Sequence, residues 1–304
     1  MNTIIYIFEF VVSAISSIGL FFILGISIAS LIKTFHLDMY LRKAFEANKK
    51  ASIPIASGTG TFSPLCSCGV IPAVAALLAS GVPLAPIMAF WITSPLMDPE
   101  SFVLTYGLLG KEMAVARVVA ALGIGLTAGY TTLYFTNKGL LGNQVLKNFK
   151  TPKPLSINLE KDLSKPQIAI VRLFRFLINF KDLGIFVGKF ILIAFVLEAL
   201  MIKYVPMDWV GRALGSSNPY GPLLAALIGV PAYASSISAM PIVRGLMDLG
   251  MDKGTALSFM IGGGATSIPA MVAVYSIVKV KTFALYITFS MVGAIVAGYL
   301  FRLF

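Results

Sequence analysis

Residues Ser57–Pro72 read SGTGTFSPLCSCGVIP, and the apolar stretch that follows continues as AVAALLASGVPLAPIMAFWITSPLMDP to Pro99. Proline removes a backbone donor and kinks a helix, and glycine loosens it, so this region is not expected to form straight helices throughout. Irregular backbone inside a bilayer is tolerated only where it lines a cavity or is buried in protein. The pattern therefore predicts a cavity, and the alternative is kinks that serve helix packing alone.

The composition around this stretch is that of a membrane protein. Of 304 residues, 58% are hydrophobic and 12% are charged, whereas soluble domains carry about 25% charged residues. Runs with few or no charges reach the ~20 residues that a helix needs to cross a bilayer, and they lie at Val11–Ile32, Met113–Phe135, Leu183–Ile202 and Thr282–Phe301. We expect an all-α, polytopic protein of the cell (inner or plasma) membrane with roughly 8–10 membrane segments.

The net charge of +11 does not indicate nucleic-acid binding, because most Lys and Arg residues lie between the apolar runs. That distribution follows the rule that basic loops face the cytoplasm. Residues 137–181 form a basic, proline-containing linker, and a second basic cluster lies between Lys33 and Lys50. Leu163–Phe180 is partly amphipathic, which fits either a helix on the membrane surface or a solvated connector. With both basic segments in the cytoplasm, each half crosses the membrane an odd number of times and both termini lie outside.

The chain is also expected to be a duplication, because it matches itself at a constant offset in residue number (241 − 72 = 169). This offset pairs Gly and Pro positions together with an aromatic position: Gly60 with Gly229, Pro72 with Pro241, Gly81 with Gly250, Phe90 with Phe259, and Gly129 with Gly298. An odd number of crossings in each half inserts the second half upside down, which is the inverted-repeat plan of many secondary transporters. The expected organisation is a first membrane repeat at 1–136, the linker at 137–181 and a second repeat at 182–304.

The second half repeats the interrupted pattern as IGVPAYASSISAMP (Ile228–Pro241) and IGGGATSIP (Ile261–Pro269). Broken or re-entrant apolar segments at corresponding positions of two halves are the sequence indication of a transporter site near the bilayer midplane. The predicted substrate-binding residues are taken from these breaks: Pro64, Cys66, Ser67, Cys68, Gly69, Ser94, Ser235, Ser236 and Gly263.

Cys66 and Cys68 are the candidate ligands for a soft metal or metalloid, since thiolates bind Cu(I), Zn and, by the same softness, trivalent arsenic. In a regular helix, side chains two residues apart point about 200° from each other. The two thiols can therefore bind one centre only if the backbone turns between them, and the neighbouring Pro and Gly favour such a turn. The alternative is that each Cys is a small buried residue. His36 lies far away in sequence, and no complete zinc ligand set is visible.

The stretch SPLCSCGVIPAVAALLASGVPLAPIMAFWITSPLMDPE (Ser63–Glu100) resembles the ArsP-like, or YraQ-like, predicted permeases. The resemblance covers most of the chain, because members of that family also have a second, related half joined by a basic loop. It implies a permease, and for some relatives the efflux of trivalent organoarsenicals, with Cys66 and Cys68 as the thiol site.

Coupling would depend on ionisable residues within spans, which are costly there and indicate function. No GxxxxGK[ST] sequence for an ATP motor is present. The coupling candidates are Asp98, Glu100, Arg117 and Glu198. Each also has a structural explanation: Asp98 and Glu100 as caps of the following helix, Glu198 near a helix end, and Arg117 snorkelling or paired with an acid such as Glu112.

The leading hypothesis is a secondary-active permease, not an enzyme, that exports a small soft solute such as a trivalent organoarsenical. A permease for another small anion, metal or sulfur compound and a membrane thiol oxidoreductase are the alternatives. The expected partners are the solute and the lipid bilayer, without a cofactor or nucleic acid, and homo-oligomerisation is left open.

Overall fold

The computed structural model describes residues 50–63, 65, 69–79, 81–140, 219–232 and 236–303, together with scattered positions between 5 and 48 and between 174 and 214. Most of these residues are helical and none of them forms a β-strand, which confirms the all-α prediction. The predicted spans Val11–Ile32 and Leu183–Ile202, and nearly all of the basic linker, lie outside the continuously described ranges.

The helices in these ranges are mostly short. In chain order they are α3 (Ser52–Thr61), α4 (Val70–Ala79), α5 (Leu84–Leu96), α6 (Pro99–Leu109), α7 (Lys111–Asn137), α10 (Gly221–Ala232), α11 (Ser236–Asp248), α12 (Lys253–Thr266), α13 (Ile268–Ile277) and α14 (Val280–Arg302). The long helices α7 and α14 cover the predicted spans Met113–Phe135 and Thr282–Phe301. Both are long and apolar enough to cross a membrane, as is the stretch Lys253–Val272, which is mostly buried in the protein.

The helices end where the sequence predicted breaks. No single helix runs through Ser57–Pro72, because α3 ends at Thr61 and α4 begins at Val70. In the following break Met97 is extended (φ −151°, ψ 125°), and Pro99 starts α6. In the second half α12 ends at Thr266, and Ser267 (φ −55°, ψ 146°) turns the chain into α13. A helix of 10 residues is ~15 Å long, about half the hydrocarbon thickness.

The helix positions repeat along the chain with the offset found in the sequence. Helices α10, α12 and α14 begin at that same offset of 169 from α3, α5 and α7 (221 − 52, 253 − 84 and 280 − 111). The turns repeat as well, because Gly81 (φ 81°) and Gly250 (φ 101°) both have the left-handed conformation that favours glycine. Gly81 N donates to Leu78 O, and Gly250 N donates to Met247 O, again at an offset of 169 (247 − 78).

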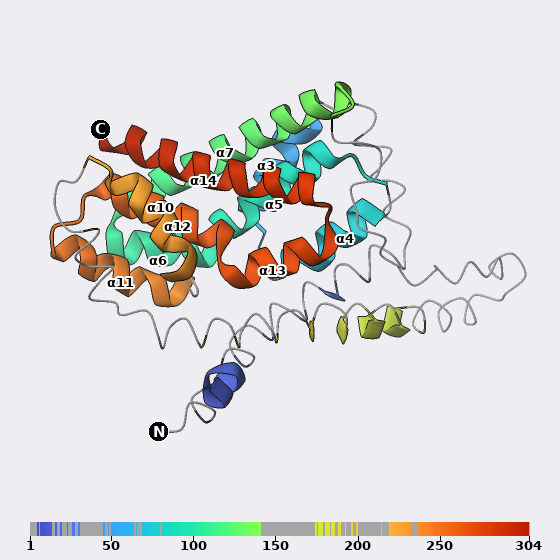
Figure 1. Ribbon diagram of the computed structural model, residues 1–304, viewed down its shortest axis with the longest axis horizontal. Helices are drawn as coiled ribbons and strands as arrows, with labels where there is room; N and C mark the ends of the chain where they lie inside the picture. Colours follow the sequence, from blue (N-terminus) through green and yellow to red (C-terminus); the bar gives the residue numbers. More distant parts are fainter. Residues whose placement is uncertain are drawn as a thin grey trace, which may run out of the picture.

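Packing within the two sets of helices follows the same plan. Helix α5 packs on α3 and α7, and α12 packs on α10 and α14. Between the sets, α7 lies against α14, α5 against α12, α6 against α11, and α4 against α13. Figure 1 shows α7 and α14 side by side along the top, with the end of α14 on the left and the end of α7 on the right, so they run in opposite directions.

The glycines of the broken segments are used for close helix contact as well as for breaks. Gly262, Gly263 and Gly264 are buried within α12 rather than forming an interruption, so in this stretch only the backbone at Ser267 departs from the helix. A Cβ atom at Gly262 would lie 2.9 Å from Ala226 Cα of α10. The absence of a side chain therefore allows α10 and α12 to approach each other.

Gly60 and Gly229, which occupy equivalent positions of the two repeats (229 − 60 = 169), are expected to be intolerant of alanine. A Cβ at Gly60 would lie 2.8 Å from Phe90 O, and one at Gly229 would lie 2.9 Å from Phe259 O. Forcing atoms into such contacts costs about 1–3 kcal/mol, so Gly60→Ala and Gly229→Ala should each lower the unfolding temperature in detergent. Gly58→Ala is the matched control, because nothing lies within 4 Å of its added Cβ. Equal effects of Gly58→Ala and Gly60→Ala would contradict the close approach.

Candidate functional site

The described residues include only part of the predicted site. Several of its residues lie outside the described part of the chain: Pro64, Cys66, Ser67, Cys68, Glu198 and Ser235. Ser236 is the first residue of α11. The residues with described surroundings are Gly69, Ser94, Asp98, Arg117 and Gly263, with Glu100 exposed in the first turn of α6.

Ser94 binds the residue that precedes the cysteine motif. Its Oγ donates to Leu65 O at 2.9 Å, and this contact is buried. Leu65 is itself 3% exposed and directly precedes Cys66 in the sequence. One of the predicted site residues therefore fixes the start of the Cys66–Cys68 segment to the last turn of α5, next to the break at Met97.

Arg117 is completely buried and hydrogen-bonds at the same break. Its Nε donates to Leu96 O at 3.0 Å and its Nη1 donates to Thr105 Oγ1 at 3.0 Å. A helix leaves its last carbonyls without intrahelical donors, and Arg117 supplies a donor to the carbonyl of the last residue of α5. Snorkelling to the membrane surface is wrong for this side chain, because it is 0% exposed. The acid suggested as its partner, Glu112, instead pairs with Lys253 (Nζ–Oε2 2.5 Å).

Tyr286 makes the corresponding contact in the second half. Its hydroxyl donates to Ala265 O at 2.6 Å near the end of α12. Tyr286 is the repeat equivalent of Arg117, and Ala265 is the repeat equivalent of Leu96 (286 − 117 = 169 and 265 − 96 = 169). A side chain from each long helix thus binds a carbonyl at the broken end of the helix beside it.

Trp91 of α5 links these two places. Its ring lies against Tyr286 with the ring centroids 5.1 Å apart and tilted by 35°. Trp91 precedes Ser94 by three residues, so both lie on one face of α5. Trp91, Thr105 and Tyr286 were not among the residues predicted from sequence. The repeat offset from Arg117 was the available signal for Tyr286, whereas nothing in the sequence distinguishes Trp91 from a packing residue.

The remaining predicted residues have structural contacts. Asp98 caps α6, accepting hydrogen bonds from Ser101 N (2.6 Å) and Ser101 Oγ (3.1 Å), as one of the two explanations from sequence proposed. Gly263 lies where α12 meets α10, since a Cβ on Gly229 would be 3.1 Å from its nitrogen. No group of three or more His, Cys, Asp or Glu side chains suited to a metal ion occurs among the described residues.

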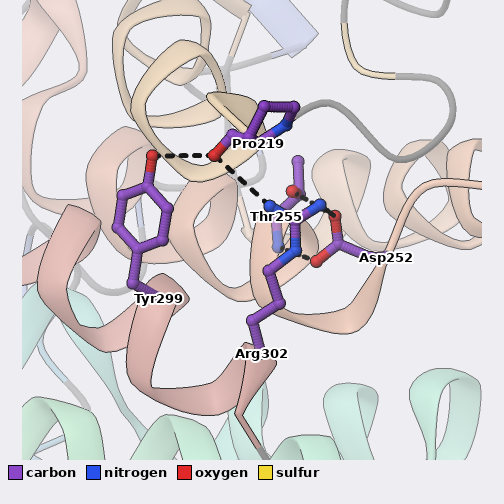
Figure 2. A network of polar contacts seen from close by, with 5 residues as sticks. All are labelled: Pro219, Asp252, Thr255, Tyr299 and Arg302. Carbon is purple, nitrogen blue, oxygen red and sulfur yellow. Dashed lines mark hydrogen bonds and ion pairs between the residues drawn. The ribbon is translucent and has the colours of Figure 1, made fainter.

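A polar network at the end of α14 has a purely structural explanation (Figure 2). Pro219 O accepts from Tyr299 Oη (2.9 Å) and from Arg302 Nη1 (3.3 Å). Arg302 Nη2 also lies 3.1 Å from Asp252 Oδ2, and Asp252 caps α12 by accepting from Thr255 N at 2.9 Å. These contacts hold the start of α10, the start of α12 and the end of α14 together.

The chain matches a family described as predicted permeases over residues 4–303. It is 23% identical to the UPF0718 protein MJ0584 of Methanocaldococcus jannaschii, over 92% of this chain and 90% of that protein. It is 24% identical to the UPF0718 protein YcgR of Bacillus subtilis, over 90% and 88% of the two chains. A putative two-component membrane permease complex subunit of Streptococcus mutans is 23% identical over 68% of this chain and 64% of its own length. No solved structure matches significantly.

Proposed function

The chain belongs to this family of predicted permeases, and on that premise we propose that it is a secondary-active permease that exports a small soft solute, with a trivalent organoarsenical as the specific candidate. The proposal rests above all on the paired helix breaks at Met97 and Ser267, because secondary transporters bind their cargo where interrupted helices of two halves meet. Membership of the family supports transport rather than catalysis, while the arsenical and the role of the thiols are our proposal.

We propose further that the two sets of helices are inverted repeats. The equivalent hydrogen bonds of Arg117 and Tyr286 support this, as does a second pair at the same offset: Tyr130 Oη donates to Lys50 O and Tyr299 Oη donates to Pro219 O. A Cβ on Gly293 would lie 2.7 Å from the side chain of Ile124, so these two residues are in close contact. They are also repeat equivalents (293 − 124 = 169). A residue that contacts its own equivalent lies near a two-fold axis. The opposite directions of α7 and α14 fit an axis in the membrane plane.

The charges suggest which end faces the cytoplasm. Among the described residues, basic side chains gather at the end where α7 finishes and α14 begins, namely Lys50, Lys138, Lys279 and Lys281, and the basic linker continues from there. The opposite end carries Lys111, Arg244, Lys253 and Arg302, so the first end is the more basic one because of the linker, which adds eight Lys and Arg residues between 141 and 181. By the positive-inside rule the first end is cytoplasmic.

This orientation predicts that the C-terminus lies outside the cell. Alkaline phosphatase fused after Phe304 should therefore be active, and green fluorescent protein at the same point should be dark. Fusions after Lys138, at the cytoplasmic end of α7, should show the reverse pattern and serve as the matched control. A fluorescent C-terminal fusion would contradict this orientation, and fluorescence of both the C-terminal and the Lys138 fusions would contradict the inverted arrangement.

Export would use the thiols as transient ligands. The segment that contains Cys66 and Cys68 is held at Leu65 by Ser94, next to the broken end of α5. A solute bound there would pass from one thiol to the other as the two halves rock and change access. The other proposed components of this site are Pro64, Ser67, Gly69, Ser235, Ser236 and Gly263.

Asp98, Glu100 and Glu198 remain proposed coupling groups. Proton binding at Asp98 would weaken its acceptance of hydrogen bonds from Ser101 and so loosen the start of α6. That change would couple a proton to the second break of the first half. Measuring export against an imposed pH gradient, in wild type and in Asp98→Asn, tests the role of Asp98, and equal proton dependence in both proteins would remove it.

Arg117 favours a second candidate, transport of a small anion, because a guanidinium remains charged and is buried here at the break. Proteoliposomes that contain the purified protein separate the two candidates. Saturable uptake of methylarsenite supports the first, and saturable uptake of an oxyanion such as sulfate, without uptake of methylarsenite, supports the second. The name of the Streptococcus mutans relative suggests that a second subunit also accompanies this chain, which pull-down from solubilised membranes tests.

A further inference from the structure

Trp91 carries a hydrogen-bond donor that has no acceptor among the described residues. Its side chain is 1% exposed, and its Nε1 has no hydrogen-bond partner among the described residues. Buried polar groups nearly always find partners, and an indole N–H can only donate. The described part of the chain therefore contains a buried donor that an acceptor on another molecule can satisfy.

The position of this donor relates it to the proposed transport site. Trp91 lies one turn before Ser94, whose hydroxyl binds Leu65 O immediately before Cys66. On its other side the ring contacts Tyr286, which binds Ala265 O at the end of α12. Trp91 thus lies one turn from Ser94 in α5 and contacts Tyr286, which binds the end of α12 in the second half.

A second buried polar group lies one helical turn after Tyr286. Ser290 Oγ has no hydrogen-bond partner in the described part of the chain, and Ser290 follows Tyr286 by one turn on the buried face of α14. A core designed only for packing would place apolar side chains at both positions. Around Tyr286, two buried polar atoms thus lack a partner among the described residues: Trp91 Nε1 and Ser290 Oγ.

We infer that the indole N–H of Trp91 binds an oxygen of the transported solute, so that the cargo is an oxygen-bearing metalloid or anion and not a bare metal cation. This inference rests on the proposed function. A bare soft cation such as Cu(I) offers no acceptor to an N–H donor, whereas arsenic in methylarsenite carries two hydroxyl groups.

The chemistry of thiol exchange decides how much oxygen remains on the solute. One Cys thiol displaces one hydroxyl: an As–S bond forms, an As–O bond breaks, and the thiol proton leaves with the hydroxyl group as water. Arsenic stays trivalent, so no oxidant or reductant is required. The second hydroxyl remains on arsenic and accepts the hydrogen bond from Trp91. The assignment requires that one thiolate at a time holds arsenic, because exchange with a second thiol would remove the remaining hydroxyl as water.

Trp91→Phe tests this assignment, because it keeps an aromatic ring against Tyr286 and removes the N–H. In proteoliposomes the KM for methylarsenite should rise about tenfold, as expected for the loss of one hydrogen bond in a buried site. Dimethylarsenite has a single hydroxyl and loses it on exchange, so its KM should not change. Met260→Leu, at the buried repeat equivalent of Trp91 (260 − 91 = 169), should leave both values unchanged.

A spectroscopic measurement on solute-free protein makes the test independent of transport. In a Trp209→Phe background the ultraviolet resonance Raman band of the Trp91 indole should report a free N–H, and methylarsenite should shift it to the hydrogen-bonded position. An N–H already hydrogen-bonded without solute, an unchanged KM for methylarsenite in Trp91→Phe, or equal losses for both arsenicals would each overturn the assignment. Wild-type vesicles that take up no methylarsenite would instead contradict the proposed arsenical export.

Discussion

Loss of methylarsenite resistance is the expected result when Cys66→Ser or Cys68→Ser replaces the wild-type protein in a host without its own arsenic exporters. Serine keeps the size of the side chain and its hydrogen-bonding ability but removes the soft thiolate that binds trivalent arsenic. Either substitution should abolish resistance, because transfer of arsenic from one thiol to the other needs both. Growth against methylarsenite concentration is the measurement.

The control for this experiment is to show that the variants are folded and present in the membrane. Each variant should accumulate in the membrane at the wild-type level, and its unfolding temperature in detergent should match wild type within a few degrees. Ser94→Ala, which removes the hydrogen bond to Leu65 O, should give partial loss of resistance with both thiols intact. Full resistance in the double Cys66→Ser/Cys68→Ser variant would remove the thiols from the mechanism.

Arg117→Met is expected to have the largest effect on stability. It deprives Leu96 O of its side-chain donor inside the protein, and an orphaned buried acceptor costs about 1–3 kcal/mol. The space left by the guanidinium adds to this cost. We expect the unfolding temperature in detergent to fall by roughly 5–10 °C, with loss of transport even in the fraction that stays folded.

Two matched variants show whether the effect comes from the break. Tyr286→Phe removes the corresponding donor from Ala265 O without changing the ring, and it should lower the unfolding temperature in the same direction by a smaller amount. Arg244→Met removes an exposed arginine that pairs with Asp248, and such surface changes usually alter stability by about 0.5 kcal/mol or less. A fall as large in Arg244→Met as in Arg117→Met would contradict the special role of the buried arginine.

The sequence predicts those parts of the fold that depend on neighbouring residues in the chain. The long apolar runs at α7 and α14 and the ends of α3, α5 and α12 follow from hydropathy and from proline and glycine, which act within a few residues. Gly262–Gly264 differ, because a break was predicted there and the three glycines lie within α12. The same residue type that loosens a chain in isolation also allows α10 to pack closely on α12, and only the tertiary structure decides between the two uses.

The candidate site is predicted less completely for the same reason. The sequence identifies Arg117 as an unusual charge within a span, but its acceptor, Leu96 O, is 21 residues away and cannot be found from spacing. Asp98 is visible as a cap because its partner lies three residues on. Trp91 resembles a packing residue until its N–H is found without an acceptor among the described residues.

Arsenic X-ray absorption of the purified protein with methylarsenite bound is the most direct test of the account. Wild-type protein should show one As–S bond together with As–C and a retained As–O bond, and the Cys66→Ser/Cys68→Ser double variant should show no sulfur neighbour. A wild-type spectrum identical to that of free methylarsenite, with no sulfur bound to arsenic, would contradict a permease that carries its solute on these thiols.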